Sequence, residues 1–245
     1  MQRARASLSI FSIVFAAINL AINATADEAP DKSIDFKLLS SFYQVSDGNH
    51  ANDINLRAKT DNQTGWVGIY RDHNGFQQER VGYENTQAFD HFHVTLSPEL
   101  ASGGYIGGSI ETEWGDDTYL IAGWSRTNLK PFYNLNFDPG DALTLGIGSK
   151  AFARTELSLY HIWDDRLGTE QQVTHAVARY EISPDQHCAV DMAYKRGFSD
   201  TGKFVEGYSM MLSYDYDSYF VRIGRDQYVN FSHVMQNTFA LGKNF

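Results

Sequence analysis

The sequence FVEGYSMMLSYDYDSYFVRIGRD, residues 204–226, decides the fold class. Large apolar and small polar residues alternate on both sides of a polar turn at Asp217 and Ser218. Side chains on a strand repeat every two residues, so the stretch predicts a β-hairpin with two unlike faces. One face of its first strand is mostly large and apolar: Phe204, Glu206, Tyr208, Met210, Leu212, Tyr214 and Tyr216. The other face is mainly small or polar: Val205, Gly207, Ser209, Met211, Ser213 and Asp215.

Two kinds of protein contain such a hairpin. In a membrane β-barrel the apolar face contacts lipid and the polar face lines the interior, with aromatic residues near the strand ends. In a soluble sandwich the large residues turn inward and charges turn outward, and its hairpins also alternate. The polar, Gly- and Ser-containing face favours the barrel, and the two ends of the chain give independent information.

The N-terminus has the three parts of a secretory signal peptide. A short basic start precedes an apolar run at residues 8–22, and the small residues Ala24 and Ala26 then form a cleavage motif. The apolar run is shorter than the roughly 20 residues that a spanning helix needs. We therefore expect a signal peptide over residues 1–26 and one β-barrel domain over residues 27–245.

The composition of the expected mature chain excludes several classes of protein. Removing Arg3 and Arg5 from 20 basic residues leaves 18 against 30 acidic ones, a formal charge of −12. The lack of a basic stripe argues against a nucleic-acid partner. No segment after the signal peptide has 18 consecutive apolar residues, which argues against membrane helices. Cys188 is the sole cysteine, so no intramolecular disulfide stabilises the domain.

Alternation and turn residues predict about fourteen strands, an all-β, antiparallel, up-and-down transmembrane barrel. The expected strands are 34–45, 53–60, 65–71, 76–87, 89–97, 105–113, 118–126, 142–149, 155–163, 171–182, 187–196, 204–216, 219–225 and 233–245. We expect a break at Pro98–Gly104 and treat residues 127–140 as a loop, because a strand at 132–137 would make the number odd. An even number places both termini on one side, as in bacterial single-chain barrels. Merging two weak early strands would give twelve.

The C-terminus carries a second class signature. The chain ends on Phe245, and Leu241 and Phe239 alternate in register with it. Here the sequence resembles the outer-membrane β-barrel proteins of Gram-negative bacteria, whose last strand typically ends in Phe and is read by the barrel-assembly machinery. Lys243 departs from the apolar or aromatic residue usual two positions before the end. The resemblance implies an outer-membrane location, with outer-membrane lipid and lipopolysaccharide as surroundings.

The inner face of the expected barrel carries charges of both signs. The lumen-facing candidates are Arg57, Lys59, Arg80, Glu84, Glu111, His187, Asp191, Lys195, Asp215 and Arg222. A channel that selects one charge more often has a ring of a single sign. Interspersed signs predict either a narrow pore crossed by an electric field or an interior held by salt bridges.

Residue pairs that could carry catalysis are poorly placed in the sequence. Ser232 and His233 are adjacent on a strand, and Ser158 and His161 are three apart, so each pair points to opposite faces. The sequence lacks the His-x-Ser-Asn signature that is typical of outer-membrane lipid hydrolases. His91 and His93 share a face but lack an identifiable third metal ligand. We expect no catalytic residues, no metal and no cofactor.

Three functions remain open, and they rest on analogy between folds. The first is a small porin-like channel for hydrophilic solutes, because a lumen of about fourteen strands is wider than side chains alone fill. The second is a structural or adhesion barrel without transport. The third is an enzyme that modifies outer-membrane lipid or polysaccharide.

Overall fold

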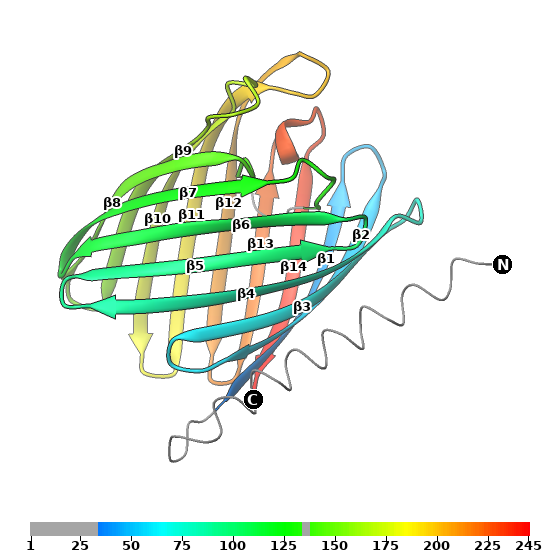
Figure 1. Cartoon of the computed structure of the whole chain (residues 1–245). Coiled ribbons are helices and arrows are strands. Elements are labelled where there is room, and N and C mark those ends of the chain that lie inside the picture. The colour runs from blue at the N-terminus through cyan, green and yellow to red at the C-terminus, as the bar shows by residue number, and fades with distance from the viewer. Residues whose placement is uncertain (1–33, 134–137) are drawn as a thin grey trace.

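A computed structural model of the chain describes residues 34–133 and 138–245, and within them fourteen antiparallel strands close into one barrel (Figure 1). The strands are β1 Asp35–Val45, β2 His50–Lys59, β3 Gln63–Asp72, β4 Gln77–Phe89, β5 Phe92–Ala101, β6 Tyr105–Gly115 and β7 Thr118–Thr127. They continue with β8 Ala142–Phe152, β9 Thr155–Asp164, β10 Gln172–Ser183, β11 Gln186–Phe198, β12 Phe204–Tyr216, β13 Tyr219–Asp226 and β14 Gln236–Asn244. The predicted up-and-down barrel of about fourteen strands is confirmed, and the alternative of twelve is wrong. The expected signal peptide lies outside the described residues.

The sheet closes where β1 pairs with β14 along nine residues, from Lys37↔Asn244 to Val45↔Gln236. Closure leaves no unpaired sheet edge, which would otherwise expose backbone donors and acceptors. Phe245 takes part in this seam. Its N–H donates to the Phe36 carbonyl (2.9 Å), and the Phe36 N–H donates to the Phe245 carbonyl (2.8 Å). The two rings also stack, with centroids 6.0 Å apart.

The connections differ at the two ends of the barrel. At the end that holds Asp35 and Phe245, consecutive strands are joined by short turns such as Asp90–His91 and Asp217–Ser218. At the other end the connections include residues 128–141, 165–171 and 227–235. We call these the short-turn end and the long-loop end.

Three predicted boundaries were wrong. Strand β2 begins at His50 rather than residue 53, because Ala51 and Asp53 continue the buried inner face. Strand β5 runs through Pro98 to Ala101, and its pairing with β4 is interrupted only between Gly82↔Glu99 and Asn85↔Leu96. Proline lacks the N–H that the ladder needs, so the strand tolerates it where that pairing is open. Strand β14 begins at Gln236 rather than 233, since a 3₁₀ turn at Val229–Phe231 occupies the preceding loop.

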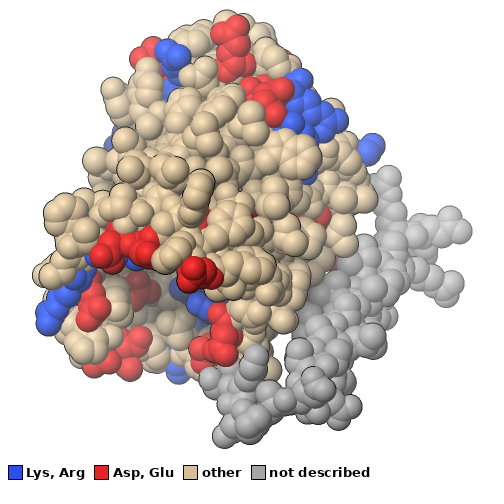
Figure 2. Space-filling model, turned by 60° about the vertical axis from the view of Figure 1, so that its left-hand side comes forward, with Lys and Arg blue, Asp and Glu red and all other residues tan. Residues whose placement is uncertain are grey.

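The outer wall of the barrel is apolar in alternate positions. In the β12–β13 hairpin Leu212 and Ile223 are exposed, whereas Ser209 and Phe220 are buried inside. Figure 2 shows one face on which uncharged residues cover the middle and charged ones gather around a hollow at the lower left. So large an exposed apolar surface is typical of a membrane or protein interface. In the described part of the chain, no helix is long and apolar enough to span a membrane.

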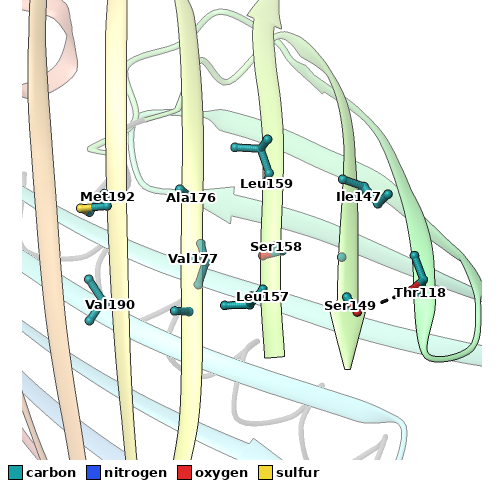
Figure 3. Close-up of a pocket in the computed structure, with 12 residues that line it drawn as sticks. Thr118, Ile147, Ser149, Leu157, Ser158, Leu159, Ala176, Val177, Val190 and Met192 are labelled. Atoms are coloured by element: carbon teal, nitrogen blue, oxygen red, sulfur yellow. Dashed lines mark hydrogen bonds between the residues drawn. The ribbon is translucent and has the colours of Figure 1, made fainter. Parts of the chain in front are cut away.

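A shallow apolar hollow of about 410 Å³ indents the wall over β8–β11 (Figure 3). Leu157, Leu159 and Met192 stand around the small side chain of Ala176. Its lining contains hydroxyl groups but no charged side chain. This surface therefore belongs to the apolar wall, and the polar chemistry of the molecule lies in the interior.

Candidate functional site in the barrel lumen

The described residues between β7 and β8, 128–133 and 138–141, contact the inner wall of the barrel. Its Tyr133 N–H donates to Gln78 Oε1 (2.7 Å), and Gln78 Nε2 donates to the Pro131 carbonyl (2.9 Å). Arg80 Nη1 donates to the Tyr133 carbonyl (3.1 Å). Gln78 and Arg80 belong to the inner face of β4 and are buried. The chain between β7 and β8 is thus fastened to a wall three strands away. We call the described residues 128–133 and 138–141 the inner loop.

Aromatic contacts extend the attachment of the inner loop on both sides. The ring of Tyr133 stacks on Tyr70 of β3, with centroids 3.6 Å apart, and its hydroxyl donates to Gln236 Oε1 of β14 (3.2 Å). The ring of Phe132 stacks on Tyr105 of β6 at 4.1 Å. The described part of the loop therefore reaches from the β6 wall to the β14 wall. Burial of the hydroxyl raises the pKa of Tyr133 above its ordinary value.

The far end of the inner loop is attached to another wall. His175, buried on the inner face of β10, contacts Asp138 Oδ1 through Nε2 and Asp191 Oδ1 of β11 through Nδ1, both at 2.8 Å. Tyr160 stacks on the imidazole with centroids 4.8 Å apart. A histidine held between two carboxylates forms charge-assisted hydrogen bonds when protonated. This cluster fixes where the loop returns towards β8.

Three cavities lie in line along the interior. A long-loop chamber of about 830 Å³ lies between the inner loop and the β5–β9 wall. A middle cavity of about 180 Å³ shares Glu99 and Phe132 with it. A short-turn chamber of about 740 Å³ shares Arg57 with the middle cavity. The middle cavity is the smallest of the three.

The charges that line these cavities are unevenly distributed. The long-loop chamber is bordered by many acids and one base: Glu99, Glu111, Asp138, Asp141, Asp164, Asp200 and Lys130. The other two cavities have bases and acids in equal number: Lys37, Arg57, Lys59, Arg80 and Arg222 against Asp35, Asp53, Glu84, Glu99 and Asp217. Strands β6 and β13 are seven places apart around the ring, so Glu111 and Arg222 stand on opposite walls. The long-loop chamber is therefore the acidic part of the lumen, and the middle cavity holds three arginines against two acids.

The ten lumen-facing candidates all fall on the inner face, in three situations. Arg57, Arg80 and Arg222 come together at the middle cavity. Lys59 and Glu84 line the short-turn chamber, and Glu111 lines the long-loop chamber. The other four take part in local wall contacts: Asp191 bonds His175, Lys195 pairs with Asp226 at 2.6 Å, and His187 is in register with Asp215.

Sequence reasoning treated the segment of the inner loop as a loop and missed that it enters the lumen, together with several groups that it contacts. Asn55 was placed on the face of Arg57, but Asp53 was taken only as the first residue of its strand, next to a turn. His175 and Tyr70 carry no local pattern that sets them apart from other strand residues. The large apolar residues of the segment, Phe132 and Tyr133 among them, were the available signal of burial.

The structure does not bring the considered Ser–His pairs together. Ser158 is buried inside, whereas His161 faces outward and bonds Thr174 at 2.8 Å. The Ser232 hydroxyl donates to the Val229 carbonyl at 2.6 Å. His91 lies in a turn and contacts Asp116 at 2.8 Å. Among the described residues, no group of three or more His, Cys, Asp or Glu side chains is placed to hold a metal ion.

Comparison with known proteins identifies a shared fold. No family model and no curated protein sequence matches the chain. The outer membrane protein Omp33 of Acinetobacter baumannii matches with a TM-score of 0.50 and 9% identity, over 86% of this chain and 97% of that one. Salmonella typhi OmpF in complex with daunomycin matches with a TM-score of 0.48 and 11% identity, over 87% of this chain and 97% of that one. The KdgM porin matches with a TM-score of 0.47 and 8% identity, over 85% of this chain and 98% of that one. At this identity, the likeness to Omp33 concerns the porin-like barrel fold alone.

Proposed function

We propose that this protein is a narrow channel for small hydrophilic solutes in a bacterial outer membrane. The observation that carries the proposal is the inner loop, fastened across the interior above a middle cavity of about 180 Å³. A fourteen-strand barrel leaves an interior wider than side chains alone fill. The inner loop narrows that interior, and the charged walls orient dipolar solutes that enter it.

The membrane location is supported by the two faces of the wall. Outward positions such as Leu212 and Ile223 are apolar and exposed, as contact with hydrocarbon requires. The expected cleavage motif at Ala24 and Ala26 would deliver the chain across the inner membrane. Outer-membrane lipid and lipopolysaccharide would then surround the apolar wall.

Labels on neighbouring positions test this location. In a Cys188→Ser background, a fluorescent probe is attached through Leu212→Cys or Ser213→Cys after reconstitution into vesicles. Lipid-soluble quenchers should reach the probe at position 212 and aqueous quenchers the probe at 213. Equal aqueous access at both positions would sink the membrane assignment.

The last strand supplies the contact with the assembly machinery in this proposal. Phe245, with Leu241 and Phe239, lies on the outer face of the strand that closes the barrel. Deletion of Phe245 should leave the chain without heat-modifiable folding in cells. Normal insertion of the shortened chain would contradict a role as the assembly signal.

Conductance in planar bilayers tests transport itself. The folded protein should form small, stable conductance steps, and replacing residues 130–139 by a Gly-Ser linker should enlarge them several-fold. A matched control exchanges residues 46–49, a turn of the same end that lines none of the three cavities, for a linker of equal length and should leave the steps unchanged. If only the variant without the inner loop conducts, the loop is a plug and the protein is a structural barrel. If neither conducts, the channel proposal is wrong.

A further inference from the structure

The middle cavity is built differently from the two chambers. Four residues paired across neighbouring strands lie side by side along one wall of this cavity. Arg222 of β13 is opposite Ala240 of β14, Ala240 is opposite Ser41 of β1, and Ser41 is opposite Asp53 of β2. The two central residues are small and buried. Long charged side chains therefore border a recess over a floor of small ones.

Four polar side-chain atoms at this cavity have no hydrogen-bond partner among the described residues. Two are donors, Nε of Arg80 and Nε of Arg222, and two are acceptors, Oδ2 of Asp53 and Oδ1 of Asn55. Asp53, Asn55 and Arg80 are only 1%, 8% and 6% exposed. Buried polar groups are costly unless they are hydrogen-bonded, so this set needs an occupant with both acceptors and donors.

The charges around the cavity indicate which end of an occupant is negative. Its lining holds Arg57, Arg80 and Arg222 against Asp53 and Glu99. Arg80 Nη2 is paired with Asp53 Oδ1 at 2.6 Å. This pair leaves Nε of Arg80 and Oδ2 of Asp53 for other partners. Arg222 has no ion pair among the described residues shorter than 4.0 Å. A carboxylate beside the Arg222 guanidinium would form a charge-assisted bond.

We propose that the middle cavity binds a small carboxylic acid whose carboxylate is next to a hydroxyl or ammonium group. The carboxylate accepts hydrogen bonds from Arg222 and Arg80, and the adjacent group donates to Asp53 or Asn55. A volume of about 180 Å³ holds about six water-sized groups at about 30 Å³ each, the size of lactate or alanine. The inference rests on the proposed function in one respect, since the acid reaches the cavity through the lumen.

Calorimetric titration of the folded protein in detergent micelles tests the proposal without requiring conductance. L-Lactate and L-alanine carry the two adjacent groups, propionate lacks both, and glycerol lacks the carboxylate. Lactate, alanine or both should bind saturably, propionate more weakly and glycerol not at all. Preference between lactate and alanine shows whether the site takes a hydroxyl or an ammonium group.

Variants separate the carboxylate from the donor side of the site. Arg222→Gln should weaken binding of the preferred acid by about 10- to 100-fold, as expected for a charged hydrogen bond. Asn55→Ala should reduce the preference over propionate while propionate binding itself is retained. Arg225→Gln, on the outer face of the same strand, is the matched control and should bind as the parent protein does.

Several results would overturn the site. These are a folded protein without saturable binding of lactate or alanine, equal binding of glycerol, or an equal loss in Arg225→Gln. Heat-modifiable migration checks that each variant is folded; if Arg222→Gln fails this check, the Asn55→Ala selectivity decides. A protein that binds the acid but does not conduct retains this site and loses the channel function. A protein that conducts but does not bind the acid retains the channel function and loses this site.

Discussion

The two sides of the lumen are built from the same strand pattern and have opposite characters. On the anchored side, β1–β4 with β13 and β14, buried side chains such as Gln78 and Arg80 bond the inner loop directly. On the hollow side, β5–β9, the loop is hydrogen-bonded near its two ends, where Asn128 accepts from the Ile106 N–H and Asp141 accepts from Thr127. Between these ends it stacks on Tyr105 and borders a chamber of about 830 Å³. The difference teaches that alternation decides which residues point inward, whereas the inner loop decides where the open space lies.

Charge explains why residues 131–133 of the loop are attached to the anchored side. The anchored side offers a backbone-binding amide at Gln78 and a guanidinium at Arg80, both of which satisfy loop carbonyls. The hollow side offers carboxylates, and Glu111 interacts electrostatically with Glu113 of the same strand and with Glu84 of β4. Like charges repel and need solvent nearby, so water rather than polypeptide suits this region.

The sharpest way to break the comparison is to neutralise one inner charge on each side. Arg80→Gln leaves Asp53 buried without its cation and should lower the free energy of unfolding by about 3–5 kcal/mol. Glu111→Gln on the hollow side should change it by about 1 kcal/mol or less. Urea unfolding in lipid vesicles measures both. Equal costs would show that the two sides do not differ in packing.

A smaller effect is expected from the two neighbouring aromatic residues of the inner loop. Tyr133→Ala loses the stack on Tyr70 and the bond to Gln236, so stability should fall by about 2 kcal/mol. Phe132→Ala loses the stack on Tyr105 and should cost about 1 kcal/mol. Single-channel recording should show wider steps for Tyr133→Ala than for Phe132→Ala. The opposite ranking would place the main attachment of the loop on the hollow side.

The smallest effect concerns ion selectivity. Glu111→Gln should lower the cation-to-anion permeability ratio by a few-fold in reversal-potential measurements, and high salt should abolish the difference because it screens the carboxylate. Glu206→Gln is the matched control, since Glu206 faces outward and accepts a hydrogen bond from Tyr194. If the control shifts selectivity equally, the acidic wall does not act on the permeating ions.

The sequence predicts the wall far better than its contents. Fourteen strands and the inward position of residues such as Arg57 and Arg222 follow from a period of two, which each segment displays locally. The β2 boundary failed because residues 46–53, SDGNHAND, are typical of a turn, and the burial of Asp53 depends on Arg80 in another strand. A local pattern carries no information about such a partner.

The middle cavity could not be predicted from sequence for the same reason. It combines Asp53 of β2, Arg80 of β4 and Arg222 of β13, which only barrel closure brings together. The inner loop was recognised as a loop, and its direction was not predicted, because Tyr133 finds its contacts in β3, β4 and β14. A resemblance at the level of the outer-membrane barrel class does not specify these contacts.

The bond between Tyr133 and Gln236 spans 103 residues of chain, and the bonds to Gln78 span about half that distance. Gln236 begins the strand that closes the barrel, so the complete constriction forms after the final seam. Until that seam forms, the loop lacks its contact with β14. Pulse-labelling of Tyr133→Cys during insertion should show early reactivity that ends when β14 joins β1. The narrowing of the lumen is thus completed by the last pairing of the sheet, and the order in which the strands join sets when the interior takes its final width.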